Sequence, residues 1–416
     1  MTLFAELGVS ARTVESLRRT SVVQPLPVQR DSIPPLLQGR DVVVEAPTGS
    51  GKTLAYVVPL VEKLDGHRPG GPRALVVTPT RELAAQIAAV LRSVDPRLRV
   101  ALLVGGVGYG AQLNALRGGA DVVIGCPGRI LDLADRGAAR LGGIALLVLD
   151  EADEMLDHGF ARDVERIIAL TPAAGPTARQ TVLASATMPA WVQTMIARHL
   201  QDPARVVVAR EQEPLLQHGL VRVDRAERVA VLSSLLHRHG DSAIVFHRTK
   251  HGAAKLARDL ARLGHRTCTL QGNLSQNARD RAIADFRSRR ADVLVATNVA
   301  ARGIDVAHVG LVVNAELPET PQWLTHRIGR TARNGNEGTA LTLLGDDDMV
   351  KWERLRRLGA PALRWVDRGT LLDTGALVFL EASPPQQRPR RDRARRPGGH
   401  GMHAAQRART RPHPGR

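Results

Sequence analysis

Short apolar runs alternate with longer segments of helical period through most of the chain. Four continuous apolar runs predict strands that are buried on both faces of a parallel sheet: 41–45, 74–78, 145–150 and 181–184. Two segments rich in Ala, Leu and Arg at helical spacing predict helices between them: 81–94 and 162–169. This alternation predicts an α/β fold with a doubly wound sheet.

The same alternation starts again in the second half of the chain. A second set of strands is predicted at 243–246, 267–270, 292–296 and 309–313. The stretch around 209–214 is polar, contains Pro214 and lacks periodicity, which is typical of a connecting segment. We therefore predict two α/β domains, 1–208 and 217–383, joined by a linker at 209–216 and separated by a cleft.

Composition narrows the class of protein. A chain of 416 residues with 43% hydrophobic residues is long enough to bury more than one core. No apolar run approaches the ~20 residues of a membrane-spanning helix, and the first residues lack the pattern of a secretory signal. Cys126 and Cys268 are too few for a disulfide framework or a zinc site. We expect a reduced, cytoplasmic protein without membrane contact.

Charge points to a polyanionic partner. The formal net charge is +17, which favours nucleic acid over a membrane surface as the partner. The codon bias of a GC-rich genome would explain the excess of arginine equally well. The segment 384–416 contains ten arginines and one acid. Its composition predicts a disordered tail. We expect the tail to add non-specific RNA affinity, and the alternative is a solubilising tail without a target.

The segment 46–53, with the sequence APTGSGKT, lies between a predicted strand and a predicted helix. In this context it predicts a P-loop, in which backbone N–H groups at a helix N-terminus bind phosphate oxygens. Lys52 would reach the β- and γ-phosphates, and the Thr53 hydroxyl would bind Mg²⁺. The predicted nucleotide contacts in this loop are Ala46, Pro47, Thr48, Gly49, Ser50, Gly51, Lys52 and Thr53.

Two acids follow the apolar strand at 145–150. Asp150 would hold Mg²⁺ through water, and Glu151 would orient and deprotonate the attacking water. Acids after a strand also cap helices, but the P-loop favours the catalytic interpretation.

The motifs together resemble those of the DEAD-box ATP-dependent RNA helicases over residues 3–345. In the first half these are PTREL at 79–83, GG at 105–106, PGR at 127–129, DEAD at 150–153 and SAT at 185–187. In the second half they are Gln276 with Arg279, ATNVAARGID at 296–305 and HRIGRTAR at 326–333. The order is that of the family, which makes the resemblance specific.

The resemblance implies two tandem RecA-like domains with an interdomain cleft, and ATP and Mg²⁺ as cofactors. Gln29 would bind adenine, and Gly303 and Asp305 would contact the nucleotide from the second domain. Arg330 and Arg333 would act as arginine fingers, on one face if their segment is helical.

Coupling and RNA contacts are also implied by the resemblance. Asp153, Ser185, Thr187 and His326 would couple hydrolysis to strand separation. RNA contacts are expected at Arg81, Gly105, Gly106, Gly128, Arg129, Gln276, Arg279, Thr297 and Arg302. Glycine amides and arginines suit sugar and phosphate, so RNA of almost any sequence is the expected partner.

Two positions depart from the family pattern near the adenine. Val22 stands where the family usually has an aromatic residue, and Leu26 where it has Thr or Ser. We expect weaker adenine stacking, which Phe4 would partly offset.

The sequence predicts an RNA-dependent ATPase that locally unwinds RNA duplexes or remodels RNA–protein complexes. Two alternatives stay open: an ATP-gated RNA clamp or assembly scaffold, and a DNA-acting superfamily 2 helicase. Ribosomal or RNA-decay assemblies are candidate settings, and the sequence does not choose between them.

Overall fold

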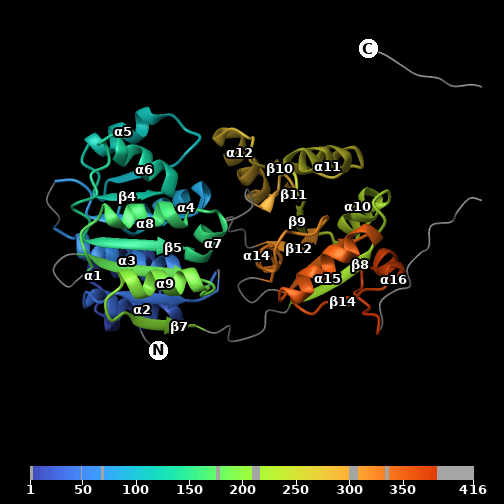
Figure 1. Cartoon of the computed structure of the whole chain (residues 1–416), viewed down its shortest axis with the longest axis horizontal. Coiled ribbons are helices and arrows are strands. Elements are labelled where there is room, and N and C mark those ends of the chain that lie inside the picture. Colours follow the sequence, from blue (N-terminus) through green and yellow to red (C-terminus); the bar gives the residue numbers. More distant parts are fainter. Residues whose placement is uncertain are drawn as a thin grey trace, which may run out of the picture. The chain divides into compact units, whose positions relative to one another are not determined.

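The computed structural model describes residues 3–47, 49–66, 70–174, 179–208, 216–298, 308–332 and 337–381. Within them the chain forms two parallel sheets, each with helices on both faces (Figure 1). The predicted tail at 384–416 lies outside the described residues, as does the predicted linker apart from Leu216. None of the described helices is sufficiently long and apolar to cross a membrane.

The first sheet has seven strands in the order β3-β4-β2-β5-β6-β1-β7, and all neighbours are parallel. The strands are β1 (Val42–Glu45), β2 (Ala74–Val77), β3 (Val100–Leu103), β4 (Val122–Gly125), β5 (Leu146–Asp150), β6 (Gln180–Ser185) and β7 (Ala204–Val207).

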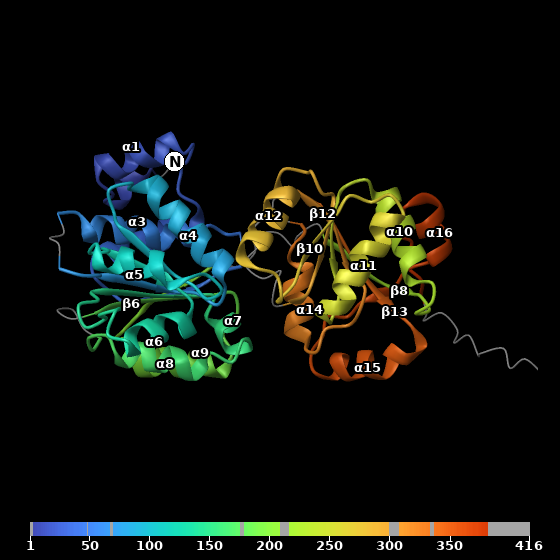
Figure 2. The ribbon, with the colours of Figure 1, turned by 90° about the horizontal axis from the view of Figure 1, so that it is seen from above.

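Helices cover both faces of this sheet. They are η1 (Phe4–Leu7), α1 (Ala11–Arg19), α2 (Pro27–Leu37), α3 (Lys52–Leu64), α4 (Arg81–Val94), α5 (Tyr109–Arg117), α6 (Pro127–Asp135), α7 (Ala152–Asp157), α8 (Ala161–Ala169) and α9 (Ala190–His199). Helices α1, α3 and α4 lie on one side of the sheet, and α6, α8 and α9 on the other (Figure 2). Along β1, Val42 and Val44 pack into one core and Val43 into the other, because successive strand side chains point to opposite faces.

The second sheet repeats the same strand order, β10-β11-β9-β12-β13-β8-β14, with parallel neighbours throughout. Its strands are β8 (Leu216–Arg222), β9 (Ser242–Phe246), β10 (Thr267–Leu270), β11 (Val293–Ala296), β12 (Val309–Asn314), β13 (Gly338–Leu344) and β14 (Arg364–Trp365). Each strand therefore occupies the place of the strand seven numbers earlier in the first sheet.

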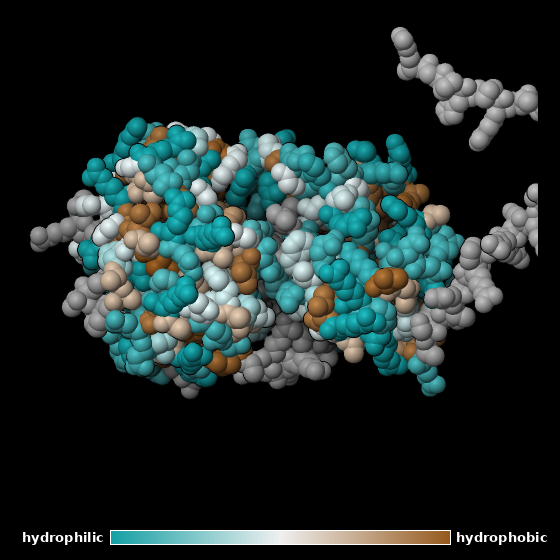
Figure 3. Space-filling view, viewed as in Figure 1, coloured by the Kyte–Doolittle hydropathy of each residue, from teal (hydrophilic) through white to brown (hydrophobic). Residues whose placement is uncertain are grey.

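Two further cores lie on the faces of the second sheet. Helices α12, α14 and α15 contribute to one core, and α10, α11 and α16 to the other. The helical elements are α10 (Arg228–His239), α11 (Lys250–Arg262), α12 (Gln276–Arg287), α14 (Pro321–Ile328), η2 (Asp346–Asp348), α15 (Met349–Arg357) and α16 (Arg368–Thr374). The face of the molecule in Figure 3 is mainly hydrophilic, with apolar side chains in small separate groups.

The predicted doubly wound fold is confirmed, and the predicted strands match to within a residue or two. The helix predicted at 81–94 coincides with α4, and the one at 162–169 with α8. Several strands escaped prediction, notably β3, β4, β8 and β13. The consequence for function is that the loops after all these parallel strands meet at one edge of each sheet.

Candidate functional site

The P-loop follows β1 and leads directly into α3, which begins at Lys52. Gly49 and Gly51 have positive φ angles of 86° and 93°, a conformation that glycine adopts without steric cost. Lys52 is buried and its ammonium group donates hydrogen bonds to the carbonyl oxygens of Ala46 and Pro47. Burial lowers the pKa of Lys52, whereas the nearby carboxylates Asp150 and Glu151 raise it. Thr48 lies outside the described residues.

Gln29 joins α2 to the P-loop. Its Nε2 donates to the Gly51 carbonyl oxygen at 3.1 Å, and its Oε1 accepts from the Leu26 N–H at 2.9 Å. A Cβ atom on Gly51 would lie 2.6 Å from Gln29 Nε2, so only glycine fits. These bonds fix the orientation of the Gln29 amide beside the loop.

Phe4 cannot offset the missing adenine-stacking residue in the way the sequence suggested. Its side chain is 1% exposed and belongs to the hydrophobic core on the α1–α4 side of the first sheet. Because the ring is covered by core residues, no face remains for a base. Val22 packs against the same core, and Leu26 is largely exposed at the start of α2.

Asp150 is the last residue of β5, and Glu151 follows it directly. Asp150 Oδ2 accepts a hydrogen bond from the Tyr56 hydroxyl at 2.7 Å, and Oδ1 accepts from the Glu151 N–H at 3.0 Å. Burial, followed by the charge of Glu151, raises the pKa of Asp150 to about 6.

Glu151 is held in an unusual backbone conformation, with a φ of 54° in the left-handed region. Burial and the neighbouring carboxylate of Glu154 raise its pKa to about 8. Its Oε2 atom is buried without a hydrogen-bond partner among the described residues. A buried acceptor of this kind is suited to receive a proton from a bound water molecule.

The donor set near the P-loop fits Mg²⁺. This ion usually takes one or two protein carboxylates together with substrate phosphates and water. Asp150 offers a carboxylate with one protein hydrogen bond on each oxygen, and the half-buried Thr53 lies in the first turn of α3. Asp150 and Thr53 therefore fit the ion that the sequence predicts.

Asp153, Ser185 and Thr187 form one hydrogen-bonded group. The Thr187 N–H and hydroxyl donate to Asp153 Oδ2 at 3.0 and 2.7 Å. The Asp153 N–H donates to Ser185 Oγ at 3.2 Å. The loop after β6 is thus tied to α7, which directly follows Glu151.

Two residues of the second domain reach α7. His326 Nδ1 lies 3.8 Å from Glu154 Oε1, and Arg330 Nη2 lies 3.7 Å from the same oxygen. Helix α14 ends at Ile328, so Arg330 lies beyond the helix and the condition for a shared helical face is not met at Arg330. Arg333, Arg302, Gly303 and Asp305 lie outside the described residues.

The residues expected to contact RNA in the first domain, apart from Gly106, line a groove of about 450 Å³. Arg81 follows β2, the glycine pair follows β3, and Arg129 follows β4, three adjacent strands of the sheet. The groove is lined by Arg81, Gly105, Gly128, Arg129 and Arg279, among others. A Cβ on Gly106 would lie 1.8 Å from Arg81 Nη1, so the glycine leaves room for this guanidinium.

Arg279 is engaged in a buried ion pair that the sequence analysis missed. Its Nη2 lies 2.6 Å from Glu82 Oε1, and both side chains are less than 10% exposed. Gln276 Oε1 accepts from Arg81 Nη1 at 3.4 Å. Thr297 is buried after β11, and its N–H donates to the Leu270 carbonyl oxygen.

Four residues that contact or line the candidate site escaped the sequence analysis: Tyr56, Glu82, Tyr109 and Glu154. Tyr56 stands four residues after Lys52, one turn along the same helix face, and Glu154 directly follows the acidic motif. These spacings were usable signals. Glu82 offered none, because its partner Arg279 is 197 positions away.

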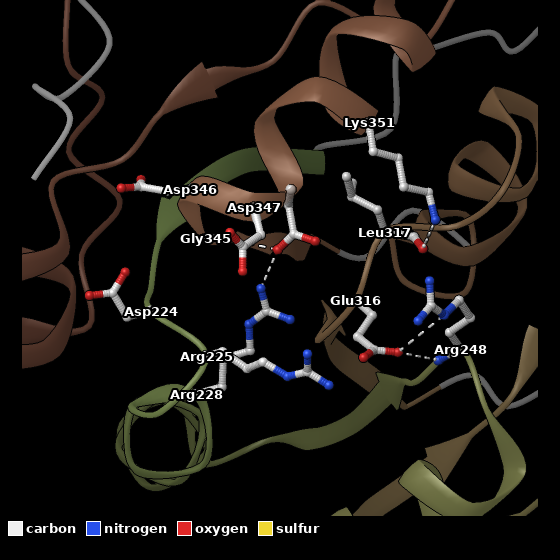
Figure 4. Close-up of a pocket in the computed structure, with 11 residues that line it drawn as sticks. Asp224, Arg225, Arg228, Arg248, Glu316, Leu317, Gly345, Asp346, Asp347 and Lys351 are labelled. Carbon is white, nitrogen blue, oxygen red and sulfur yellow. Dashed lines mark hydrogen bonds and ion pairs between the residues drawn. The ribbon is translucent and has the colours of Figure 1, made fainter. Parts of the chain in front are cut away.

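The second domain has a cavity of about 220 Å³, smaller than the groove of the first domain (Figure 4). Its position in the second sheet corresponds to that of the P-loop in the first. It lies at the carboxyl ends of β8, β12 and β13, which correspond to β1, β5 and β6. The loop after β8 lacks glycine, and the cavity is lined by acids and bases that partly pair with each other. Arg228 contacts Asp348, and the Arg248 N–H donates to Glu316.

Comparisons with known proteins agree with this geometry. Residues 26–195 match the family model of the DEAD/DEAH box helicases, and residues 227–335 match that of the helicase conserved C-terminal domain. DEAD-box ATP-dependent RNA helicase 9, mitochondrial, of Arabidopsis thaliana is 39% identical over 354 residues, which are 82% of this chain and 57% of that protein. DEAD-box ATP-dependent RNA helicase 3B, chloroplastic, of Zea mays is 40% identical over 82% of this chain and 47% of its own length. The chain thus spans about half the length of these curated relatives.

Solved structures of similar proteins match this chain over a larger share of their own length. A DEAD box protein from Methanococcus jannaschii is 33% identical with a TM-score of 0.53, and the match covers 88% of this chain and 99% of that chain. Dbp5 of S. cerevisiae bound to RNA and ADP BeF3 is 29% identical with a TM-score of 0.77, covering 89% and 97%. The likeness therefore includes both domains.

Proposed function

The chain belongs to the DEAD-box family, and from this premise we propose that it is an RNA-dependent ATPase that locally unwinds RNA duplexes or remodels RNA–protein complexes. The observation that carries the proposal is that Arg330 of the second domain lies 3.7 Å from Glu154, three residues from Glu151. A cation of one domain therefore stands beside the acidic site of the other. Hydrolysis would be coupled to closing and opening of the two domains.

The nucleotide is proposed to be ATP, bound by the P-loop with Lys52 on the β- and γ-phosphates. On binding, the Lys52 ammonium would exchange its bonds to the Ala46 and Pro47 carbonyls for bonds to phosphate oxygens. Gln29 would contact adenine, and Gly303 and Asp305 would complete the site. Mg²⁺, held by Asp150 and Thr53, would neutralise charge on the phosphates.

Glu151 is proposed as the general base. Its buried, unpartnered Oε2 would orient the attacking water and accept its proton. Arg330, with Arg333, would stabilise the charge that develops on the γ-phosphate in the transition state. In related phosphoryl transfers such a finger contributes ~10³–10⁵ in rate.

RNA is proposed to lie in the groove of Arg81, Gly105, Gly106, Gly128 and Arg129, with Gln276, Arg279, Thr297 and Arg302 from the second domain. Contacts of this type bind sugar and phosphate without reading sequence. The Asp153–Ser185–Thr187 hydrogen bonds and His326 would transmit the state of the ATP site to the RNA groove.

We further propose the domain limits 1–208 and 217–383, a linker at 209–216, and a tail at 384–416 that adds non-specific RNA affinity. Work in the cytoplasm, in ribosomal or RNA-decay assemblies, would fit this activity.

Steady-state ATP hydrolysis by the full chain tests the proposal, without nucleic acid, with single-stranded RNA, and with DNA of matched sequence. Stimulation by RNA alone is expected, followed by unwinding of a short RNA duplex. Equal stimulation by DNA would favour the DNA-acting helicase. RNA binding without hydrolysis under any condition would favour the clamp.

A further inference from the structure

Tyr109 stands at the rim of the RNA groove and is not a core residue. It is the first residue of α5, its side chain is 37% exposed, and it lines the groove together with Arg129. Its ring contacts two cations: the guanidinium carbon of Arg129 is 4.4 Å from the ring centroid, and that of Arg136 is 4.6 Å away. Distances of this size are favourable for cation–π attraction.

The Asp132 carboxylate contacts all three of these side chains, those of Tyr109, Arg129 and Arg136. The Tyr109 hydroxyl donates to Asp132 Oδ2 at 2.7 Å, and Arg136 Nε donates to Oδ1 at 2.7 Å. Arg136 Nη2 also donates to the Tyr109 hydroxyl at 3.3 Å, and Arg129 Nε lies 3.6 Å from Asp132 Oδ2. Hydrogen bonds from Arg136 and Tyr109 hold the pKa of Asp132 below its usual range.

The arrangement brings two like charges to one aromatic ring with a single carboxylate to offset them. The hydrogen bond and charge of Asp132 raise the pKa of Arg136, so its charged form is stabilised beside the ring. The two guanidinium groups still outnumber the one carboxylate, and the excess positive charge favours an anionic ligand. Arg129 also donates from Nη1 to the Val107 carbonyl oxygen at 3.2 Å, which further restricts the orientation of its side chain.

We infer that Tyr109 is a positioning residue for RNA binding, which together with Asp132 holds Arg129 and Arg136 as a pair of phosphate-binding arginines at the edge of the groove. The inference rests on the proposed function, because it names further residues of the same RNA site. It adds Arg136 to the phosphate contacts and assigns Tyr109 a role through the two arginines. The Tyr109 ring contacts the two guanidinium groups, so we do not expect it to stack on a nucleobase.

The first test compares Tyr109→Leu and Tyr109→Phe in the full chain. RNA affinity would be measured by fluorescence anisotropy with a labelled oligouridylate, in the presence of Mg²⁺ and a non-hydrolysable ATP analogue. Loss of two cation–π contacts is expected to weaken binding by Tyr109→Leu about three- to tenfold. Tyr109→Phe keeps the ring and loses only the hydroxyl, so its affinity should lie close to that of the wild type.

The second test uses the salt dependence of binding, which a merely structural role would not alter. Arg136→Gln should reduce the slope of log K against log salt by about 0.7, the value of one phosphate contact on a single strand. Arg136→Lys should restore the slope. Arg97→Gln is the matched control, because Arg97 has a similar exposure and is paired with Asp95. It precedes β3 and so lies at the amino end of this strand, whereas the groove lies at the carboxyl end.

Wild-type affinity and slope in Tyr109→Leu and Arg136→Gln would overturn the inference while RNA-stimulated hydrolysis still supports the proposed function. An equal loss of slope in Arg97→Gln would also overturn it, since general charge would then explain the effect. Failure of the proposed function would appear in the wild type itself, as absence of RNA-stimulated ATP hydrolysis.

Discussion

At the scale of single residues, the acidic end of β5 combines burial with unbalanced charge. Asp150 and Glu151 are both almost fully buried. Burial and the charge of Glu151 raise the pKa of Asp150, and burial and the charge of Glu154 raise the pKa of Glu151. The left-handed φ of Glu151 adds backbone strain of about 1–3 kcal/mol. Strain and unsatisfied buried groups that persist together are typical of sites that bind a ligand.

Replacing Glu151 by Gln should stall turnover while ATP and RNA still bind. The amide has the size of the carboxyl group but cannot accept the proton of the attacking water, so a loss of about 10²–10⁴-fold in the hydrolysis rate is expected. Single-turnover hydrolysis and equilibrium binding of both ligands measure the two effects separately. Rapid hydrolysis by this variant would contradict the assignment of Glu151 as the base.

The same variant should be more stable than the wild type near pH 8 without nucleotide and Mg²⁺. The folded-state pKa of Glu151 is raised from 4.5 to about 8, so the folded state binds its proton more tightly than the unfolded state. Stability is therefore lost as the pH rises between these values, at up to about 1.4 kcal/mol for each unit of difference. Gln does not titrate, so thermal unfolding should show a gap that widens toward pH 8 and closes toward pH 4.5. A gap independent of pH would exclude titration as its cause.

At the scale of elements, the site depends on the loops between strands and helices. The P-loop is shaped by positive φ at Gly49 and Gly51 and is held to α2 by Gln29. The loop after β6 is held to α7 through Asp153. Each loop is therefore held by a side-chain hydrogen bond to a neighbouring segment, which fixes the position of its backbone.

Gly51→Ala should weaken ATP binding more than backbone strain alone explains. The new Cβ would meet Gln29 Nε2 at 2.6 Å and Leu26 Cδ1 at 2.7 Å, and a φ of 93° is unfavourable for alanine. The matched control is Gly66→Ala, with a φ of 70° and no atom within 4 Å of the new Cβ. Both variants should lose about 1–2 kcal/mol of stability from the left-handed conformation. Titration with a fluorescent ATP analogue should show a loss of affinity in Gly51→Ala only; equal affinities would contradict the role of the Gln29–Gly51 contact.

At the scale of the whole molecule, two sheets of identical strand order carry different chemistry. The first keeps a glycine-rich loop after β1, whereas the loop after β8 in the second contains Asp224 and Arg225 in its place. The second domain contributes cations to the first through Arg279 on Glu82 and Arg330 near Glu154. One domain thus holds the nucleotide-binding loop and the other supplies charges around it.

Deleting 384–416 should leave hydrolysis at saturating RNA nearly unchanged. The segment carries ten arginines and one acid, so its loss should weaken RNA affinity and flatten the salt slope by about 0.7 for each phosphate contact removed. RNA titrations of the full and shortened chains at several salt concentrations measure this. Unchanged affinity at low salt would make the tail a solubiliser only.

The sequence by itself determined the local parts of this protein. Apolar runs predicted strands such as β5, helical period predicted α4, and the P-loop and acidic motif were readable because their residues are adjacent in the chain. Their chemistry needs only a strand end and a helix start, which short-range pattern encodes.

Only the tertiary structure decided the partners that lie far apart in sequence. Tyr56 meets Asp150 across 94 positions, and Glu82 meets Arg279 across 197. The structure also placed Phe4 in the core and Tyr109 between two arginines. Such contacts depend on which strands become neighbours and which face a helix presents, and these follow from packing of the whole chain rather than from any local pattern.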